Sequence, residues 1–524
     1  MGPAVQLGFV IDQSRCIGCH ACTVACKSEN DVPLGDFRTW VKYTEQGTFP
    51  EVDRSFTVLR CNQCTDAPCV EICPVTALDK RSDGIVDIDP DICIGCKGCL
   101  QACPYDALFL NEEKGTVQKC HFCAHRTEQG LAPACTVVCP TEALIPGDFH
   151  DPESRVSQMR DEFDLQVRKP EAGTNPNVFY RDVDSAGIDP SLTNAAGGYL
   201  WSNQRPGPQL ESQIYEALAA SMEEKALPES RTTYNVDRKP AWGTAISGYL
   251  WLKSIAGGAF IAGAPLLAPF ADFWGHKPTA AATWLVPGLA FLALSATLVC
   301  LVADLKKPSR FLSIILRPNW NSWLAKGSYL LLGFHVLLAL WLGMAYLERP
   351  PTGFFGVSLM VTTGVFGALS AMYTGWLFAQ AKGRVLWMRR GLALHLFVQA
   401  VLAGSASLLL LDTLVPLGRE AVEMLGSMLT AGLTGHLLFT LCEGQLAPLA
   451  REAEYKRASR LLTHGPYAKK HWVLGVGLGI ALPLVMLFFP ESTLLWPLAG
   501  LLALVGLAVE EDLLVRAGQA LPIS

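Results

Sequence analysis

The stretch CIGCKGCLQACP, residues 93–104, places four cysteines at the spacing C-x2-C-x2-C-x3-C and ends on a proline. Three further stretches in the first 140 residues vary this theme, and together they hold 16 of the 18 cysteines of the protein. The four sets are Cys16, Cys19, Cys22 and Cys26; Cys61, Cys64, Cys69 and Cys73; Cys93, Cys96, Cys99 and Cys103; and Cys120, Cys123, Cys135 and Cys139. Closely spaced thiolates followed by x3-C-P are the pattern of cubane iron–sulfur clusters.

The spacing has a local physical reason. A tight loop wraps three thiolates around three irons, and the fourth cysteine opens a short helix that reaches a neighbouring cluster. Structural zinc also uses C-x2-C pairs, but it needs only four ligands and does not explain C-x2-C-x2-C-x3-C. A disulfide framework would require an oxidising compartment and looser spacing. We therefore expect four [4Fe–4S] clusters.

Sets two and three are separated by ALDKRSDGIVDIDPDI (77–92), which has a turn signal at Asp83-Gly84 and an alternating strand after it. This is the layout of a bacterial two-cluster ferredoxin, in which two clusters exchange their fourth ligands. Sets one and four are then expected to pair around this insert. The four predicted ligand groups are Cys61, Cys64, Cys69 with Cys103; Cys93, Cys96, Cys99 with Cys73; Cys16, Cys19, Cys22 with Cys139; and Cys120, Cys123, Cys135 with Cys26.

The second half of the sequence has a different character. All runs of at least 18 residues without Asp, Glu, Lys or Arg lie after position 240: 254–271, 278–303, 327–347, 350–381, 391–411, 424–442, 471–490 and 492–509. A helix needs about 20 apolar residues to cross a membrane. The predicted fold is an α+β double bacterial-ferredoxin-like domain (1–190), a linker with an amphipathic helix at 209–227 (191–240) and an all-α eight-helix transmembrane bundle (241–524).

Charge divides at the same point. The 524 residues have a net charge of −6, which is the sum of −13 up to position 240 and +7 after it. The acidic front half argues against nucleic-acid binding. Loops on the side where the first span begins carry fifteen positive charges against three on the other side. Positive loops stay cytoplasmic, so we expect a multi-pass protein of the inner (cytoplasmic) membrane with its iron–sulfur domain in the cytoplasm. The first residues do not read as a signal peptide, although a partner can carry an export signal for a complex.

Both halves resemble known respiratory subunits. Residues 1 to about 190 resemble the four-cluster electron-transfer subunit of DMSO reductase and polysulfide reductase complexes, through the x4 gap in set two, the x11 gap in set four and RKPEAGTNPNVFY (168–180). Residues from about 240 resemble the NrfD/polysulfide reductase membrane anchor. The matching stretches are GYLWLKSIAGGAF (248–260), DLKKPSRFLSIILRPNWNSW (304–323), YTGWLFAQAKGR (373–384) and AGQALPIS (517–524). Two subunits that are usually separate are fused here.

The resemblance implies a division of labour. The anchor would exchange electrons with membrane quinone or quinol, and the iron–sulfur part would relay them to or from a molybdopterin-containing catalytic subunit. The sequence has no G-x-G-x-x-G after a strand, no Walker motif and no catalytic triad. The main substrate chemistry is therefore expected on a partner protein.

Candidate quinone contacts are Tyr373, Tyr249 and Lys253. Quinone chemistry needs hydrogen-bonding groups at membrane depth, and such groups are costly there unless they face a cavity. Interfacial tyrosines also form ordinary aromatic belts, and a lone lysine can snorkel to the surface. Further polar groups are expected in the same half of the membrane: Asp304, Asn319, His395 and His436.

Two rival interpretations remain open. A b-type haem would need two of His335, His395 and His436 as ligands, although no two of these share a helix at a suitable repeat. An ion-translocating redox module would use His335 and the acidic cluster Glu510, Glu511 and Asp512. Cys300 and Cys442 stand alone in apolar runs and are expected to behave as small buried hydrophobes.

Overall fold

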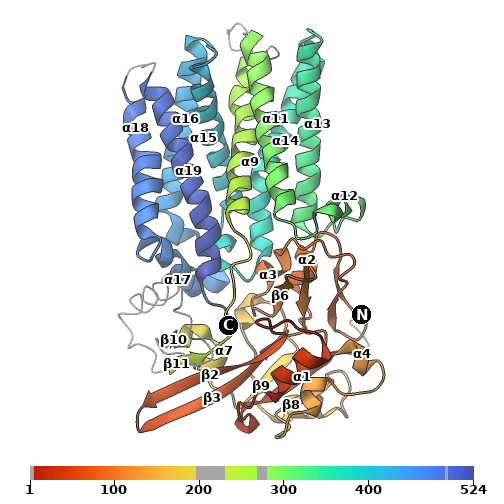
Figure 1. The fold of residues 1–524 in the computed structure, drawn as a ribbon. Helices are drawn as coiled ribbons and strands as arrows, with labels where there is room; N and C mark the ends of the chain where they lie inside the picture. The colour runs from red at the N-terminus through yellow and green to blue at the C-terminus, as the bar shows by residue number, and fades with distance from the viewer. Residues whose placement is uncertain (1–4, 196–229, 268, 270–279, 490–493) are drawn as a thin grey trace.

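The computed structural model describes residues 5–195, 230–267, 269, 280–489 and 494–524 (Figure 1). A domain of small sheets and short helices lies at one end of a bundle of long, roughly parallel helices. The expected amphipathic helix at 209–227 falls outside the described residues.

Two sheets frame the N-terminal domain. In the first, β1 (Leu7–Asp12) lies between β8 (Leu144–Asp148), which is antiparallel to it, and β9 (Val178–Arg181), which is parallel to it. In the second, the long hairpin of β2 (Thr39–Thr48) and β3 (Glu51–Arg60) is extended by β11 (Ser230–Tyr234) and β10 (Thr193–Ala195). The first sheet thus brings the beginning and the end of this domain together.

The ferredoxin-like centre consists of two similar units, each a short helix followed by a hairpin. The first has α2 (Pro68–Ile72), β4 (Leu78–Lys80) and β5 (Val86–Ile88), and the second has α3 (Gly98–Ala102), β6 (Leu108–Asn111) and β7 (Thr116–Lys119). The turn and strand predicted after Asp83 are confirmed by the pairing of β4 with β5. Helices α2 and α3 pack against each other, so the two units lie side by side.

The bundle contains seven helices, among the described residues, that are long and apolar enough to cross a membrane. They are α9 (Thr244–Gly263), α11 (Ala280–Ala303), α13 (Trp323–Tyr346), α14 (Gly353–Gln380), α15 (Leu392–Asp412), α16 (Arg419–Leu441) and the continuous helix of η9 (Lys470–Ala481) and α18 (Leu482–Leu487). The expected eighth segment is also a long helix, α19 (Leu495–Ala520). Helix α19 is not among the seven helices that are apolar enough to cross a membrane, because Glu510, Glu511 and Asp512 interrupt its apolar stretch.

Helix α9 is the centre of the bundle and packs against α11, α14, α15 and α19. Its crossing with α15 is very close: a Cβ atom on Gly258 would lie 1.7 Å from the Ala400 carbonyl oxygen. On α15, a Cβ atom on Gly404 would lie 1.9 Å from the Gly258 carbonyl carbon. Small residues that let two backbones touch are the usual means of helix association in membranes.

The N-terminal domain contacts the loops at one end of the bundle, which we call the cluster-side face. These are the loops between α11 and α13, including the short helix α12 (Ser313–Leu316), and between α14 and α15. The Asn319 side chain donates to the Cys73 carbonyl over 2.8 Å, and the Arg310 guanidinium donates to the Cys93 carbonyl over 2.9 Å. The positive loops that the sequence places on one side of the membrane therefore hold the cysteine-rich domain.

Candidate functional site

The inner two cysteine groups form where α2 and α3 end. Cys73 directly follows α2 and Cys103 directly follows α3, both in extended conformation. The expectation that the fourth cysteine opens a short helix is therefore wrong: it ends one, and the chain turns after it. The Cys103 thiol is an electrostatic neighbour of Cys61, Cys64 and Cys69. The Cys73 thiol lies beside the third set, and these four cysteines line one cavity: Cys73, Cys93, Cys96 and Cys99.

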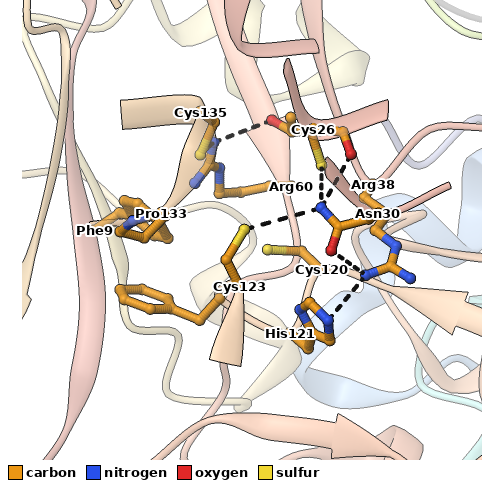
Figure 2. A pocket seen from close by; sticks show the side chains of 12 residues that line it. Phe9, Cys26, Asn30, Arg38, Arg60, Cys120, His121, Cys123, Pro133 and Cys135 are labelled. Carbon is orange, nitrogen blue, oxygen red and sulfur yellow. Dashed lines mark hydrogen bonds between the residues drawn. The ribbon is translucent and has the colours of Figure 1, made fainter. Parts of the chain in front are cut away.

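The outer two groups form in the same crossed manner. Cys26, from helix α1 (Ala21–Glu29), lines a cavity with three cysteines of the last set: Cys120, Cys123 and Cys135 (Figure 2). The Cys16 thiol is instead an electrostatic neighbour of Cys19 and Cys139, and Cys22 interacts with Cys16. The structure therefore brings all sixteen cysteines into the four combinations that the ferredoxin layout implies.

These cysteines suit iron–sulfur clusters rather than disulfides or single ions. All sixteen are free thiols, and twelve of them are buried. Burial raises the pKa of the Cys22 thiol and of the Cys103 thiol, each to about 11, and a bound cation would favour their thiolate forms. Within the described segments no three His, Cys, Asp or Glu side chains converge on one ion. A cubane spreads its four ligands over four irons, whereas zinc draws them to one point.

Two buried cations lie among the groups. The Arg60 guanidinium donates to the Cys135 sulfur over 3.3 Å and stacks on the Phe9 ring at 4.1 Å. Although burial acts to lower the pKa of Arg60, the nearby thiolates of Cys135 and Cys120 outweigh it and raise the pKa. The Lys119 ammonium lies between groups, because Cys61, Cys120 and Cys69 all act on it.

Polar side chains also surround the sulfurs of the outer group in Figure 2. The Asn30 amide is 3.8 Å from the Cys26 sulfur and 3.9 Å from the Cys123 sulfur. Arg38 holds Asn30 in this position by donating to its side-chain oxygen over 3.1 Å. Hydrogen bonds to sulfur are one of the means by which a protein sets a cluster's reduction potential.

The four groups follow one another from the protein surface to the bundle, and we number them in that order. The first is Cys16, Cys19, Cys22 and Cys139; the second is Cys26, Cys120, Cys123 and Cys135; the third is Cys61, Cys64, Cys69 and Cys103; the fourth is Cys73, Cys93, Cys96 and Cys99. Cys22 of the outermost group interacts with Cys135 of the next, Lys119 joins that group to the third, and Cys69 of the third interacts with Cys99 of the fourth. Cys19 at one end is exposed. At the other end the Cys96 carbonyl accepts a hydrogen bond from the Trp242 indole over 3.2 Å, directly before α9.

A cavity of about 320 Å³ opens from the fourth group into the bundle. Cys96 and Asp304 lie at its cluster-side end, and Tyr249 of α9 and Tyr373 of α14 line it within the bundle. Most of its other walls are aliphatic or aromatic. Apolar cavities with a few polar groups are typical of small-molecule sites.

The two tyrosines belong to a buried hydrogen-bonded group. The Tyr249 hydroxyl and the Thr374 hydroxyl are 2.7 Å apart. The Lys253 ammonium donates to Thr374 over 2.6 Å and to the Ala371 carbonyl over 3.0 Å. Lys253 is fully buried and does not line the cavity, so the alternative that it snorkels to the surface is wrong.

Several other polar residues predicted from the sequence do not line this cavity: Asn319, His335, His395 and His436. Asn319 serves the contact between domains. His395 and His436 hydrogen bond directly to each other, with 2.6 Å between ring nitrogens, which leaves no space for an iron between them. His335 packs on the Phe291 ring, 4.2 Å between centroids. Cys300 and Cys442 are half-buried rather than buried.

Sequence reasoning missed Thr374 and Trp242. Thr374 follows Tyr373 in the YTGWLFAQAKGR stretch, so its position next to a candidate quinone contact could have indicated it. Trp242 precedes the first span and stacks on Phe378 and Trp387 at 6.1 and 5.4 Å between centroids. Nothing in its local sequence distinguishes it from an interfacial tryptophan.

Three family models match the protein. "Polysulphide reductase, NrfD" matches residues 232–522, "4Fe-4S dicluster domain" matches 52–149, and "4Fe-4S binding domain" matches 7–28. The first of these covers more than half of the sequence.

Several curated proteins are similar to the N-terminal part. A tetrathionate reductase subunit of Salmonella typhimurium is 46% identical over 205 residues, which is 38% of this protein and 81% of that one. The iron-sulfur subunit of the arsenate respiratory reductase of a Shewanella species is 36% identical over 224 residues, 34% of this protein and 96% of that one. A polysulfide reductase polypeptide of Wolinella succinogenes is 38% identical over 189 residues, 36% of this protein and 99% of that one.

Proposed function

This protein belongs to the polysulphide reductase (NrfD) family, and from this premise we propose that it carries electrons between a membrane quinone and a partner reductase. Its 4Fe-4S domain and its multi-pass membrane anchor are joined in one polypeptide. Four [4Fe–4S] clusters, held by the sixteen cysteines, would supply one-electron steps along the domain. A molybdopterin-containing catalytic subunit would exchange these electrons with the final substrate.

One observation carries the quinone assignment: Cys96 and Tyr373 line the same cavity. A quinone there would have its head group between a cluster ligand and buried hydroxyl groups. Hydroxyls of Tyr249 and Tyr373 can donate to quinone carbonyl oxygens, and the aliphatic walls suit an isoprenoid tail. Lys253 acts through Thr374 in this proposal and keeps the hydroxyl group oriented.

We also propose that α19 is the eighth membrane span. Its first half is apolar, and its acidic residues turn inward: Glu511 is fully buried and Asp512 accepts a hydrogen bond from Ser247 of α9 over 3.0 Å. Charges that face a bundle interior are tolerated in a membrane. The positive loops at the cluster-side face favour the cytoplasmic side for the clusters.

The partner would dock at the opposite end of the row of cysteine groups. Cys19 of the first group is exposed there. Large apolar side chains near this end of the row are exposed as well: Ile17, Val24, Val137 and Val138. An apolar patch on a soluble domain commonly marks a protein interface. The relatives named above are each named as one component of a reductase, which supports such a partner.

Tyr373→Phe tests the quinone site. We expect quinone-coupled turnover of the purified complex to fall about 100-fold, because a positioned proton donor typically contributes at least this factor, while cluster signals in electron paramagnetic resonance stay unchanged. Tyr346→Phe is the matched control, since Tyr346 is exposed at the other end of the bundle. Equal turnover in both variants would remove Tyr373 from the site.

Cys99→Ser tests the cluster count. Cys99 belongs to the fourth group, so its loss should remove up to a quarter of the bound iron and uncouple quinone from the remaining clusters. Cys300→Ser, in α11, is the control and should retain all iron. A full iron content in Cys99→Ser would contradict the assignment.

A further inference from the structure

The half of the bundle away from the quinone cavity contains buried polar groups that the electron path does not use. Several of their atoms have no hydrogen-bond partner among the described residues: both carboxylate oxygens of Glu511, Nε2 of His436, Nε of Arg389 and Oε1 of Gln399. All four residues are at least nine-tenths buried. Buried polar atoms without partners are rare, and they commonly mark bound water or a functional group.

The first part of this set begins at the cluster-side face. Glu443, in the loop after α16, lies 3.8 Å from the Arg389 guanidinium. Arg389 contacts the Nδ1 atom of His395, and the other ring nitrogen of His395 is 2.6 Å from His436. Burial raises the pKa of the Glu443 carboxyl, so this group can take up a proton at the edge of the membrane.

The second part lies between η9 and α19. The His471 Nδ1 atom and the Glu510 carboxylate are 2.9 Å apart, and both are within electrostatic range of His436. A Cβ atom on Gly475 would lie 1.8 Å from the Glu510 oxygen. A glycine at this position is what leaves room for the carboxylate inside the bundle.

The third part reaches the quinone cavity. Glu511 interacts electrostatically with Glu510, Arg389 and Lys253. Lys253 donates to Thr374 over 2.6 Å, and Thr374 is 2.7 Å from the Tyr249 hydroxyl, which lines the cavity. Glu511 thus interacts both with Arg389, which contacts His395, and with Lys253, which donates to the hydroxyl group at the proposed quinone site.

We propose that these side chains form a proton path from the cluster-side face to the quinone cavity. The inference rests on the proposed function. Reduction of a quinone to a quinol adds two electrons, which would arrive one at a time from the clusters that the cysteine groups would hold, and two protons, which form the two O–H bonds. Tyr249 gives a proton to a quinone oxygen and regains one through Thr374, Lys253 and Glu511, with bridging water at the unpartnered atoms. Quinol oxidation runs the same steps in reverse, and the protons leave at the same face.

Glu511→Gln tests the path in the complete complex reconstituted in liposomes, with decylubiquinone and its quinol as probes. We expect turnover to fall about 100-fold, as for loss of a proton-transfer group, and Glu511→Asp to recover part of it. Binding of the quinone-site inhibitor 2-heptyl-4-hydroxyquinoline N-oxide and the cluster signals should match the unmodified protein. In infrared difference spectra of quinone reduction, a carboxyl band should disappear in Glu511→Gln alone.

Glu423→Gln is the matched control, because Glu423 lies on the exposed surface of α16 in an i,i+4 pair with Arg419. Turnover of Glu511→Gln equal to that of Glu423→Gln would overturn the path. Loss of inhibitor binding in Glu511→Gln would also overturn it, since Glu511 would then be part of the binding site. Proton uptake from the opposite side of the liposome would overturn it as well. By contrast, a complex in which Tyr373→Phe has no effect and the inhibitor never binds would refute the quinone proposal itself.

Discussion

Lys97 and Asp304 form an ion pair across the boundary between the cysteine-rich domain and the bundle, with 2.8 Å between Nζ and Oδ1. Both side chains are largely buried, at 8% and 14% exposure. Lys97 follows Cys96 in the sequence, and Asp304 lines the cavity. The pair therefore fixes the fourth cysteine group against the proposed quinone site.

Asp304→Asn should loosen this contact. Removing one partner of a buried pair leaves an uncompensated charge and costs about 3–5 kcal/mol, so we expect a lower apparent melting temperature and slower quinone-coupled turnover. Adding Lys97→Met should recover part of the stability. The control is Glu112→Gln, because Glu112 forms an exposed pair with Lys306 at 2.7 Å, and such pairs contribute about 0–1 kcal/mol. Equal losses in both variants would contradict a special role for the buried pair.

Arg60→Gln should lower the reduction potential at the outer group of Cys26, Cys120, Cys123 and Cys135. The Arg60 guanidinium is fully buried and donates to the Cys135 sulfur over 3.3 Å, so it stabilises added negative charge. A hydrogen bond to a charged group contributes about 1.5–3 kcal/mol, which corresponds to a shift of about 65–130 mV for one electron. Redox titration followed by paramagnetic resonance measures it, with exposed Arg54→Gln as control.

Lys42→Met should stabilise the N-terminal domain in a pH-dependent way. Burial, followed by the charge of Arg168, lowers the pKa of Lys42 to about 7 from 10.5. Below pH 7 the native state must bury a charged ammonium; between pH 7 and 10.5 the native lysine is neutral while the unfolded one is charged, so stability rises with pH through this window.

Lys42→Met removes that cost, so its advantage should be largest at pH 6, on the order of 5 kcal/mol for a pKa lowered from 10.5 to about 7, and should disappear towards pH 10.5. Thermal melts at several pH values measure it. An advantage that did not change with pH would mean that the pKa of Lys42 is the same in the native and unfolded states, so that burial does not lower it.

The cysteine groups could be predicted from the sequence because cluster ligation is local: three ligands lie in one loop and the fourth is exchanged with a neighbouring loop. The position of the short helix was predicted wrongly, since Cys73 and Cys103 end the helices α2 and α3 rather than open them. The strand after Asp83 was confirmed. Tertiary relations in the bundle could not be predicted in this way. The direct contact of His395 with His436 depends on how α15 packs against α16.

The same limit applies to two buried charges. A lone lysine near the end of an apolar run is typical of a side chain that extends to water at the membrane surface. Lys253 is nevertheless fully buried, because its ammonium donates hydrogen bonds to Thr374 and to the Ala371 carbonyl. The run of charge-free residues predicts α19 as an eighth span, but it does not reveal that Glu511 is buried among neighbouring helices. In both cases, partners distant in sequence decide whether the charge can be inside.

Gly258→Ala should disrupt the bundle at its centre. The added Cβ atom would lie 1.7 Å from the Ala400 carbonyl oxygen of α15, which is a backbone atom and cannot rotate away. Overpacking of a tight interior costs about 1–3 kcal/mol or more, so we expect a lower unfolding temperature in detergent. The control is Gly288→Ala in α11, where nothing lies within 4 Å of the new Cβ atom. Because alanine favours helix over glycine by about 1 kcal/mol, that variant should be as stable as the unmodified protein or more so. If the two substitutions had the same effect, the contact between α9 and α15 would not be the close crossing described here.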